Sequence, residues 1–182
     1  IQLLIGSHFD LEGGLPCRLV LIAPHRDGYG DLCELITLAR LRCDKGHYRL
    51  SAQDIQVAAP RCEALLIPRR DDDQATLLQQ AHWLQNVFGA RATLAMERLL
   101  YADDTLVMER VQHVADQLRL PIAAAGDVLM HRRARKPLQD TLSAIRLKTP
   151  VADCGFQLAR NAEQHLRSRL RLAAMYPTAL LA

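Results

Sequence analysis

Short apolar runs that alternate with helical patterns constrain the fold of this chain more than any other feature. They occupy residues 2–5, 9–12, 18–23, 64–67, 92–96 and 122–125. Most are near-continuous rather than alternating in polarity, which is typical of strands buried on both faces in a parallel arrangement. The β–α alternation predicts an α/β fold, as either an open doubly wound sheet or a barrel. No G-x-G-x-x-G or P-loop pattern occurs, which disfavours a nucleotide-binding sheet.

The segments between these runs carry signals for helices. Apolar residues at positions 32, 35, 36 and 39 form an i, i+3, i+4, i+7 stripe after a Gly-Tyr-Gly turn. Ser51 and Asp54 resemble a helix N-cap with an acidic residue in the first turn. Acidic residues at 71–73 and 103–104 are expected to open two further helices, and capping is favoured over metal binding for both clusters. A last helix is predicted over residues 168–175.

Length and composition favour one globular domain with a sizeable core, since the chain has 182 residues and is 49% hydrophobic. No apolar run approaches the roughly 20 residues that cross a bilayer, and no signal-peptide pattern occurs. The chain begins at Ile1, inside an expected strand, so we interpret it as a piece of a larger protein. The five cysteines form no CxxC pair, which predicts reduced, mostly buried thiols of a cytosolic protein.

Charge is distributed unevenly along the chain. Residues 1–130 hold 13 Lys and Arg against 17 Asp and Glu, whereas residues 131–182 hold 10 against 3. The basic C-terminal third indicates a surface that faces nucleic acid or an acidic partner, or else a plain solvated face. Aromatic residues make up only 4% of the chain, which argues against a platform for stacking bases.

The motif Gly126-Asp127-Val128-Leu129-Met130-His131 follows the last apolar run. If the strand continues through it, positions 127, 129 and 131 share one face. Asp127 and His131 could then ligate a metal, but Leu129 could not. Without further context, a capping aspartate and a surface histidine are the better interpretation.

A basic segment and a helix pattern, RKPLQDTLSAIR, come next, with Pro137 suited to the first helical position. Leu138, Leu142 and Ile145 form an i, i+4, i+7 stripe, so that face is expected to be core. The cations around the helix could grip phosphates or pair with a following domain, and the interdomain role is favoured. These cations are Arg132, Arg133, Arg135, Lys136, Arg146 and Lys148.

Four motifs in colinear order resemble one protein family. GYGDLCELITLARLRCDKGHYRL, GDVLMH, RKPLQDTLSAIR and NAEQHLR are similar to the PHP domain of error-prone DnaE-type DNA polymerases, the ImuC branch of bacterial DNA polymerase III alpha subunits. The resemblance implies a partial PHP-type distorted (β/α) barrel whose first strands lie upstream of Ile1. It also implies that residues 1–182 belong to one PHP domain, with about 150–182 leading into a polymerase domain.

The resemblance further implies a metal site for zinc or manganese at Asp127, His131, His8 and Glu97. The chain departs from the family pattern at His8, where an acidic ligand is usual, and at Leu129 and Arg18, where histidines are common. Leucine cannot ligate a metal and arginine repels one, so the site is expected to be degenerate. Glu97 could equally form an ion pair with Arg98 or Arg91.

The sequence therefore leaves two alternative functions open. The first is a structural and interaction module in an error-prone, translesion DNA polymerase that acts in DNA damage-induced synthesis. The second is a metal-dependent phosphoesterase or proofreading exonuclease domain. By resemblance, the parent is a bacterial cytoplasmic DNA-directed DNA polymerase, a nucleotidyltransferase with magnesium in its polymerase domain. Its implied partners are DNA, translesion-complex proteins and the sliding clamp, without a membrane. We expect this chain to carry no catalytic residue for polymerisation.

Overall fold

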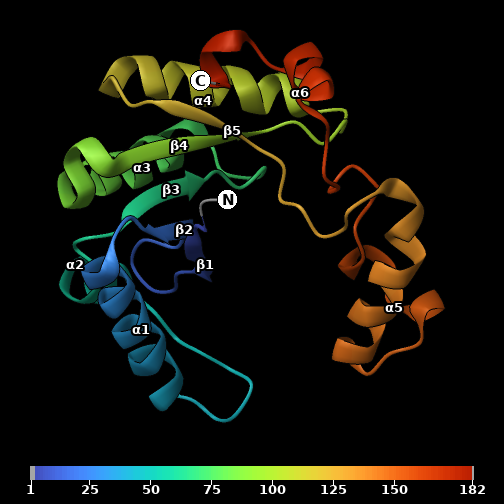
Figure 1. Cartoon of the computed structure of the whole chain (residues 1–182), viewed down its shortest axis with the longest axis horizontal. Coiled ribbons are helices and arrows are strands. Elements are labelled where there is room, and N and C mark those ends of the chain that lie inside the picture. Colours follow the sequence, from blue (N-terminus) through green and yellow to red (C-terminus); the bar gives the residue numbers. More distant parts are fainter. Residues whose placement is uncertain (1–2, 182) are drawn as a thin grey trace. The chain divides into compact units, whose positions relative to one another are not determined.

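The computed structural model describes residues 3–181, which fold as an α/β protein around a five-stranded sheet (Figure 1). The strands are adjacent in sequence order, β1-β2-β3-β4-β5, so the described part of the sheet is open. β1 pairs antiparallel with β2, β2 antiparallel with β3, and β3 parallel with β4. The strand bounds are Ile5–Asp10, Arg18–Ala23, Glu63–Ile67, Ala92–Glu97 and Ile122–Ala125.

The α/β class is confirmed, but the expectation of parallel strands is wrong for the first three. In place of the two strands predicted at 2–5 and 9–12, the structure has one strand, β1, over Ile5–Asp10; residue 2 lies outside the described residues. In β2, Leu19 and Leu21 are fully buried while their neighbours are only partly buried, as expected for one-sided antiparallel packing. Gly6 allows β1 to approach closely, because a Cβ there would lie 2.8 Å from the Leu21 carbonyl oxygen.

Six helices connect and follow the strands. Two of them, α2 and α3, begin at predicted caps: Ser51 and Asp54 form a reciprocal capping box at α2, and Asp73 accepts a 2.8 Å bond from the Thr76 N–H at α3. His25, which has no cap signal in sequence, caps α1 by accepting a bond from the Gly28 N–H through Nδ1. The helices are α1 Arg26–Leu41, α2 Ala52–Ala58, α3 Gln74–Phe88, α4 Asp104–Leu118, α5 Lys136–Leu147 and α6 Arg169–Met175.

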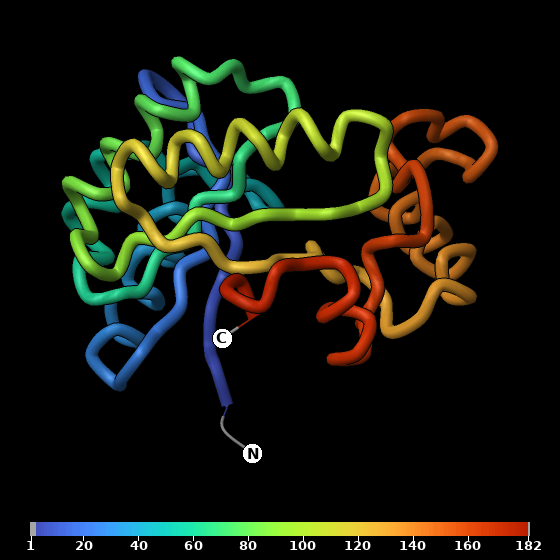
Figure 2. The backbone as a smooth tube through the Cα atoms, turned by 90° about the horizontal axis from the view of Figure 1, so that it is seen from above, coloured from blue at the N-terminus to red at the C-terminus, as the bar shows by residue number. Residues whose placement is uncertain are grey.

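The chain divides into two compact units. The first comprises the residues up to Met96 together with Glu109–Ala123, and the second comprises Glu97–Met108 and the residues from Ala124 onward. In the first unit α1 packs on β2 and α3 on β3. Figure 2 shows the later part of α4 running alongside β4 within this unit.

The first unit holds most of the buried leucines and one buried charge. Asp31 of α1 is 5% exposed and accepts hydrogen bonds from the backbone N–H and the guanidinium of Arg61. These bonds lower the pKa of Asp31, chiefly through the Arg61 side chain. The loop before β3 is thereby fixed to α1.

All five cysteines are free thiols, as predicted, and three of them are buried: Cys17, Cys62 and Cys154. Burial raises the pKa of Cys17 to about 12 and that of Cys62 to about 11. Among residues 3–181, no helix is long and apolar enough to cross a membrane.

Candidate functional site

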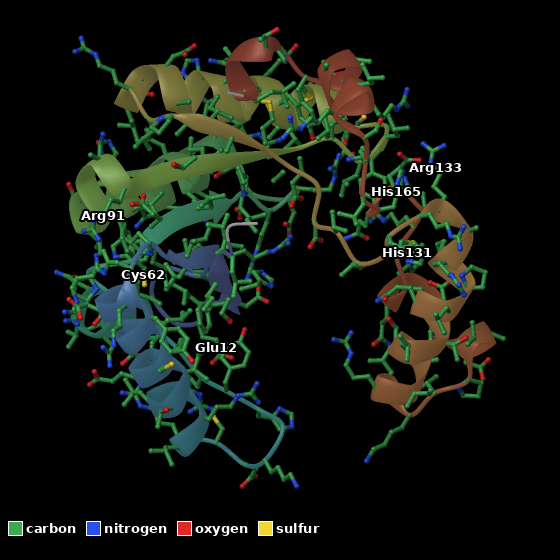
Figure 3. The ribbon with its side chains drawn as sticks, viewed as in Figure 1. Glu12, Cys62, Arg91, His131, Arg133 and His165 are labelled. Carbon is green, nitrogen blue, oxygen red and sulfur yellow. The ribbon has the colours of Figure 1, made fainter. Side chains whose placement is uncertain are left out.

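The candidate site lies in the second unit, where the motif at 126–131 meets the motif at 161–167. The Gln164 carbonyl accepts bonds from the N–H groups of Leu129 and Met130, at 2.9 and 3.2 Å. The Leu166 N–H donates in return to the Met130 carbonyl at 3.0 Å. Two segments more than thirty residues apart in sequence therefore lie side by side. Figure 3 shows His131, Arg133 and His165 in this region, near the start of α5.

This pairing corrects one sequence prediction. β5 ends at Ala125, and Asp127 has φ of 39°, in the left-handed region. The only β-type pairing in the motif is the isolated bridge of Met130 with His165. Positions 127, 129 and 131 therefore do not share a strand face, because the chain turns at Asp127. Aspartate adopts this conformation more readily than most residues.

The Asp127 carboxylate contributes to the same junction. Its Oδ2 accepts a 2.6 Å hydrogen bond from Nε2 of Gln164, a residue that is 8% exposed. A backbone carbonyl and a side-chain amide of one residue thus hold both sides of the turn. The local role of Asp127 is to fix the loop that follows β5.

Glu163 joins two arginines. Its carboxylate lies 2.8 Å from Nη2 of Arg133 and 3.4 Å from Nη2 of Arg167. The Arg167 side chain is 2% exposed, and its Nη2 also donates to the carbonyls of Glu163 and Arg98, at 2.8 and 3.2 Å. Burial alone would raise the pKa of Glu163, but bonds and charge from Arg133 and Arg167 outweigh it and lower the pKa. Glu163 is therefore ionised at neutral pH.

Further bonds extend this network to the end of β4. Nδ2 of Asn161 donates to the Leu99 carbonyl at 2.7 Å, while Oδ1 of Asn161 accepts from the Glu163 N–H at 2.9 Å. The buried Tyr176 hydroxyl accepts from the Arg98 N–H at 2.8 Å and donates to the Ala125 carbonyl at 3.0 Å. The segments after β4, after β5 and after α6 are thus held together by polar side chains.

The four predicted metal ligands are not brought together as one group within a unit. Glu97 ends β4 and Asp127 follows β5, both in the second unit, and the His131 side chain is exposed. His8 is exposed on β1 of the first unit, opposite Val20. The described residues contain no group of three or more His, Cys, Asp or Glu side chains placed to hold a metal ion. The metal assignment stays a prediction.

The possible ion-pair partners of Glu97 also make other bonds. Nη1 of Arg98 donates to the Met175 carbonyl at 2.7 Å, and Nη1 of Arg91 donates to the Cys62 carbonyl at 3.0 Å. Glu97 itself is half-buried at the last position of β4.

The six predicted binding cations fall into two groups. Arg133 pairs with Glu163, and Lys136 pairs with Asp140 at 2.7 Å one turn further along α5. The other four are exposed, and no carboxylate among residues 3–181 pairs with them. They are Arg132, Arg135, Arg146 and Lys148.

α5 forms as predicted, with Pro137 in its first turn, but the prediction that its apolar stripe is core is wrong. Leu138, Leu142 and Ile145 are 51%, 55% and 68% exposed. The inward face carries instead Ala144 and the Lys136–Asp140 pair, which are buried or half-buried. Periodicity predicts that the side with Ala144 and the Lys136–Asp140 pair faces solvent. In the structure, α5 contacts the rest of the unit through this side.

A cavity of about 420 Å³ adjoins the exposed side of α5. Gln164, whose side chain also holds Asp127, forms part of its wall. The other lining residues are Leu129, Gln139, Leu142, Ser143, Arg146, Gln157, Leu158 and Ala159. The cavity therefore combines leucine side chains with amides, one hydroxyl and one guanidinium.

Sequence reasoning assigned no roles to the residues that organise this site. Asn161, Glu163, Gln164 and Arg167 stand in a segment with neither helical nor strand periodicity, and Tyr176 follows the last helix. The available signal was the density of amide and charged side chains in a loop, which indicates loops held by side-chain hydrogen bonds.

The fold and the network define an α/β segment whose second unit is organised by buried ion pairs and side-chain-to-backbone bonds. Over nearly its whole length, the chain is homologous to a segment of bacterial proteins named error-prone DNA polymerase. It is 46% identical to that of Ralstonia nicotianae over 97% of the chain, 48% identical to that of Azoarcus sp. over 99%, and 42% identical to that of Pseudomonas aeruginosa over 100%. The expected resemblance to these polymerases is confirmed.

The chain spans 18%, 17% and 17% of the lengths of these three relatives. No family model matches the chain.

Proposed function

We propose that this chain is a PHP-type segment of an error-prone DNA polymerase of the ImuC branch, and that it serves as a structural and interaction module. The parent protein would copy damaged DNA in the bacterial cytoplasm, with DNA, the sliding clamp and translesion proteins as partners. The observation that carries the proposal is the homology of nearly the whole chain to error-prone DNA polymerases.

The geometry of the second unit supports a structural role. The motifs at 126–131 and 161–167, which carry the resemblance, bond to each other through Gln164, Met130 and Leu166. Polar residues in a hydrolytic site face a substrate, whereas Asp127 and Glu163 here accept bonds from neighbouring loops. Asp127 and Glu163 thus stabilise the conformation of the loops at this surface.

The side chains present fit a metal poorly. Leu129 offers no ligand atom, and the Asp127 carboxylate already accepts an amide bond. A hydrolytic site needs most of its ligands, because each open position lowers affinity and misplaces the activated water. The proposed site is therefore a degenerate relative of a zinc or manganese centre.

Metal analysis of the full-length protein tests this role. Zinc and manganese content should be the same in the wild type, in Asp127→Ala and in the matched control Asp153→Ala, an exposed acid of the same unit. Stoichiometric metal lost only in Asp127→Ala would favour the phosphoesterase or exonuclease function instead.

The proposal that the parent is a polymerase has its own test. The full-length protein should extend a primer across a damaged template with magnesium, whereas residues 1–182 should not, since two-metal nucleotidyl transfer needs closely placed carboxylates. Extension by the 182-residue chain, free of other polymerases, would contradict the assignment.

The four exposed cations are proposed to face another domain, with DNA as the alternative. Reversing the charge of Arg132 and Arg135 should lower the melting temperature of the full-length protein without changing the salt dependence of DNA binding. If they contact DNA instead, each lost contact reduces the slope of log K against log salt by roughly 0.9 for duplex or about 0.7 for single strands.

A further inference from the structure

The orientation of α5 is unusual for a helix in a folded unit. On a helix with 3.6 residues per turn, Leu138, Leu142 and Ile145 lie on the face opposite Ala144 and Asp140. The large apolar side chains are about half or more exposed, while the inward face is held by a methyl group and an ion pair. Helices of this length derive most of their stability from packing of an apolar face. The described residues cover only about half or less of each side chain on the apolar face of α5.

The surroundings of α5 share this property. Val128 and Leu129 are about half exposed, and Phe156, in the short 3-10 turn Gly155–Gln157 that follows α5 in sequence, is 96% exposed. The second unit exposes more large apolar side chains than it buries. Its buried apolar residues are Leu99, Val107, Met130, Ala144, Cys154, Met175 and Tyr176.

The stripe also opens into the cavity. Leu142 belongs to the apolar stripe and also lines the cavity, together with Leu129. Arg146 lies one turn beyond Leu142 and also lines the cavity, where it pairs with no carboxylate among residues 3–181. The surface thus presents an apolar floor with a guanidinium at one side. We define the docking surface as Leu129, Leu138, Leu142, Ile145 and the cavity.

We propose that this docking surface binds a segment of the same polypeptide that lies outside the 182 residues, and that this segment carries apolar side chains next to an acidic one. The inference rests on the proposed function, in which the chain is part of a longer polymerase. The apolar side chains would cover Leu138, Leu142 and Ile145, and the carboxylate would pair with Arg146.

Two observations select this occupant. First, the relatives are more than five times as long as the chain, since it spans only 17–18% of them, so most of their polypeptide is available to cover the surface. Second, exposed Arg135, Arg146 and Lys148 around the helix make the surface complementary to acidic residues. Nucleic acid would satisfy these cations through phosphates but would leave the leucine stripe in water.

Site-specific cross-linking in the full-length protein tests the proposal. A photoreactive amino acid is placed at position 142 or 145, and the matched control places it at Leu170, which is 85% exposed on α6 of the same unit. We expect positions 142 and 145 to cross-link within one molecule to a segment beyond the 182 residues, and position 170 not to. The mapped segment should contain apolar residues and at least one Asp or Glu.

Other cross-linking products would overturn the proposal. These are products within residues 1–182, between two copies of the chain, to a separate protein or to added DNA, as well as a yield at 142 and 145 no higher than at 170.

A second measurement uses substitutions. Leu142→Asp with Ile145→Asp should raise the rate of limited proteolysis in native full-length protein, by about tenfold for each residue if undocking limits cleavage. Leu170→Asp should leave the rate unchanged. Equal rates in the two variants would refute docking even if the cross-linked variants fail to fold. Primer extension by the wild type is measured in parallel: its absence refutes the polymerase assignment, whereas its presence without cross-links refutes only the docking surface.

Discussion

Replacing Glu163 with glutamine should loosen the junction between the two motifs of the second unit. Glu163 is 7% exposed and is the carboxylate partner of Arg167, whose side chain is 2% exposed. Removing one member of a buried pair costs about 3–5 kcal/mol, because the remaining charge loses its partner. Arg167 would keep its bonds to two carbonyls, and Arg133 is half-exposed and would be solvated. We therefore expect Glu163→Gln to lower the stability of the junction by a smaller amount, about 2–3 kcal/mol.

The effect should depend on pH with a definite sign. The arginines hold the pKa of folded Glu163 below its ordinary value of about 4.5. A carboxyl group whose pKa is lower in the folded state than in the unfolded state stabilises the fold. This stabilisation is complete above the unfolded-state pKa and disappears as the pH falls through the folded-state pKa. The difference between wild type and Glu163→Gln should thus be constant at neutral pH and shrink below about pH 4.5.

Amide hydrogen exchange is the assay of choice, because it measures opening at the individual N–H groups of this junction. The N–H groups of Leu129, Met130 and Leu166 all donate across the junction. Their exchange should accelerate roughly 30- to 150-fold in Glu163→Gln, which corresponds to the loss of about 2–3 kcal/mol. The control Asp153→Asn removes an exposed acid of the same unit and should leave these rates unchanged. Equal protection in Glu163→Gln and wild type would refute the structural role of the Glu163 network.

Three further outcomes follow from the described contacts. Asp31→Asn should lower stability by about 1–2 kcal/mol in thermal unfolding, while Asp27→Asn, which removes an exposed carboxylate 3.8 Å from the same Arg61, should change little. Tyr176→Phe should cost about 1–3 kcal/mol and speed exchange of the Arg98 amide, because that N–H loses its acceptor; unchanged exchange would contradict the bond. At pH 8, iodoacetamide should label exposed Cys33 in the native protein but spare Cys17, whose pKa is about 12, and mass spectrometry of the labelled peptides decides this.

Local features of the chain were predictable because they depend on neighbouring residues. The bounds of β2 and β5 agree with their apolar runs, and Ser51, Asp54 and Asp73 cap helices as expected. Each of these signals is contained within a few positions of the sequence. The homology to error-prone DNA polymerases was likewise evident in the motifs themselves.

The candidate site required the tertiary structure. Strand periodicity placed residues 127, 129 and 131 on one face, but a left-handed Asp127 and the pairing of Met130 with His165 decide their directions. Glu163 and Arg133 are thirty residues apart, and such a contact leaves no periodic trace. The metal ligands and the exposed cations remain predictions for the same reason, since their partners depend on parts of a protein distant in sequence.

The sequence by itself determined where α5 begins and which of its residues form an apolar stripe. It did not determine which side of the helix faces the second unit. That choice depends on the total burial offered by every neighbouring segment, and here Ala144 and the Lys136–Asp140 pair face inward. Periodicity shows that a helix has an apolar face, whereas only the arrangement of the surrounding chain decides what that face contacts.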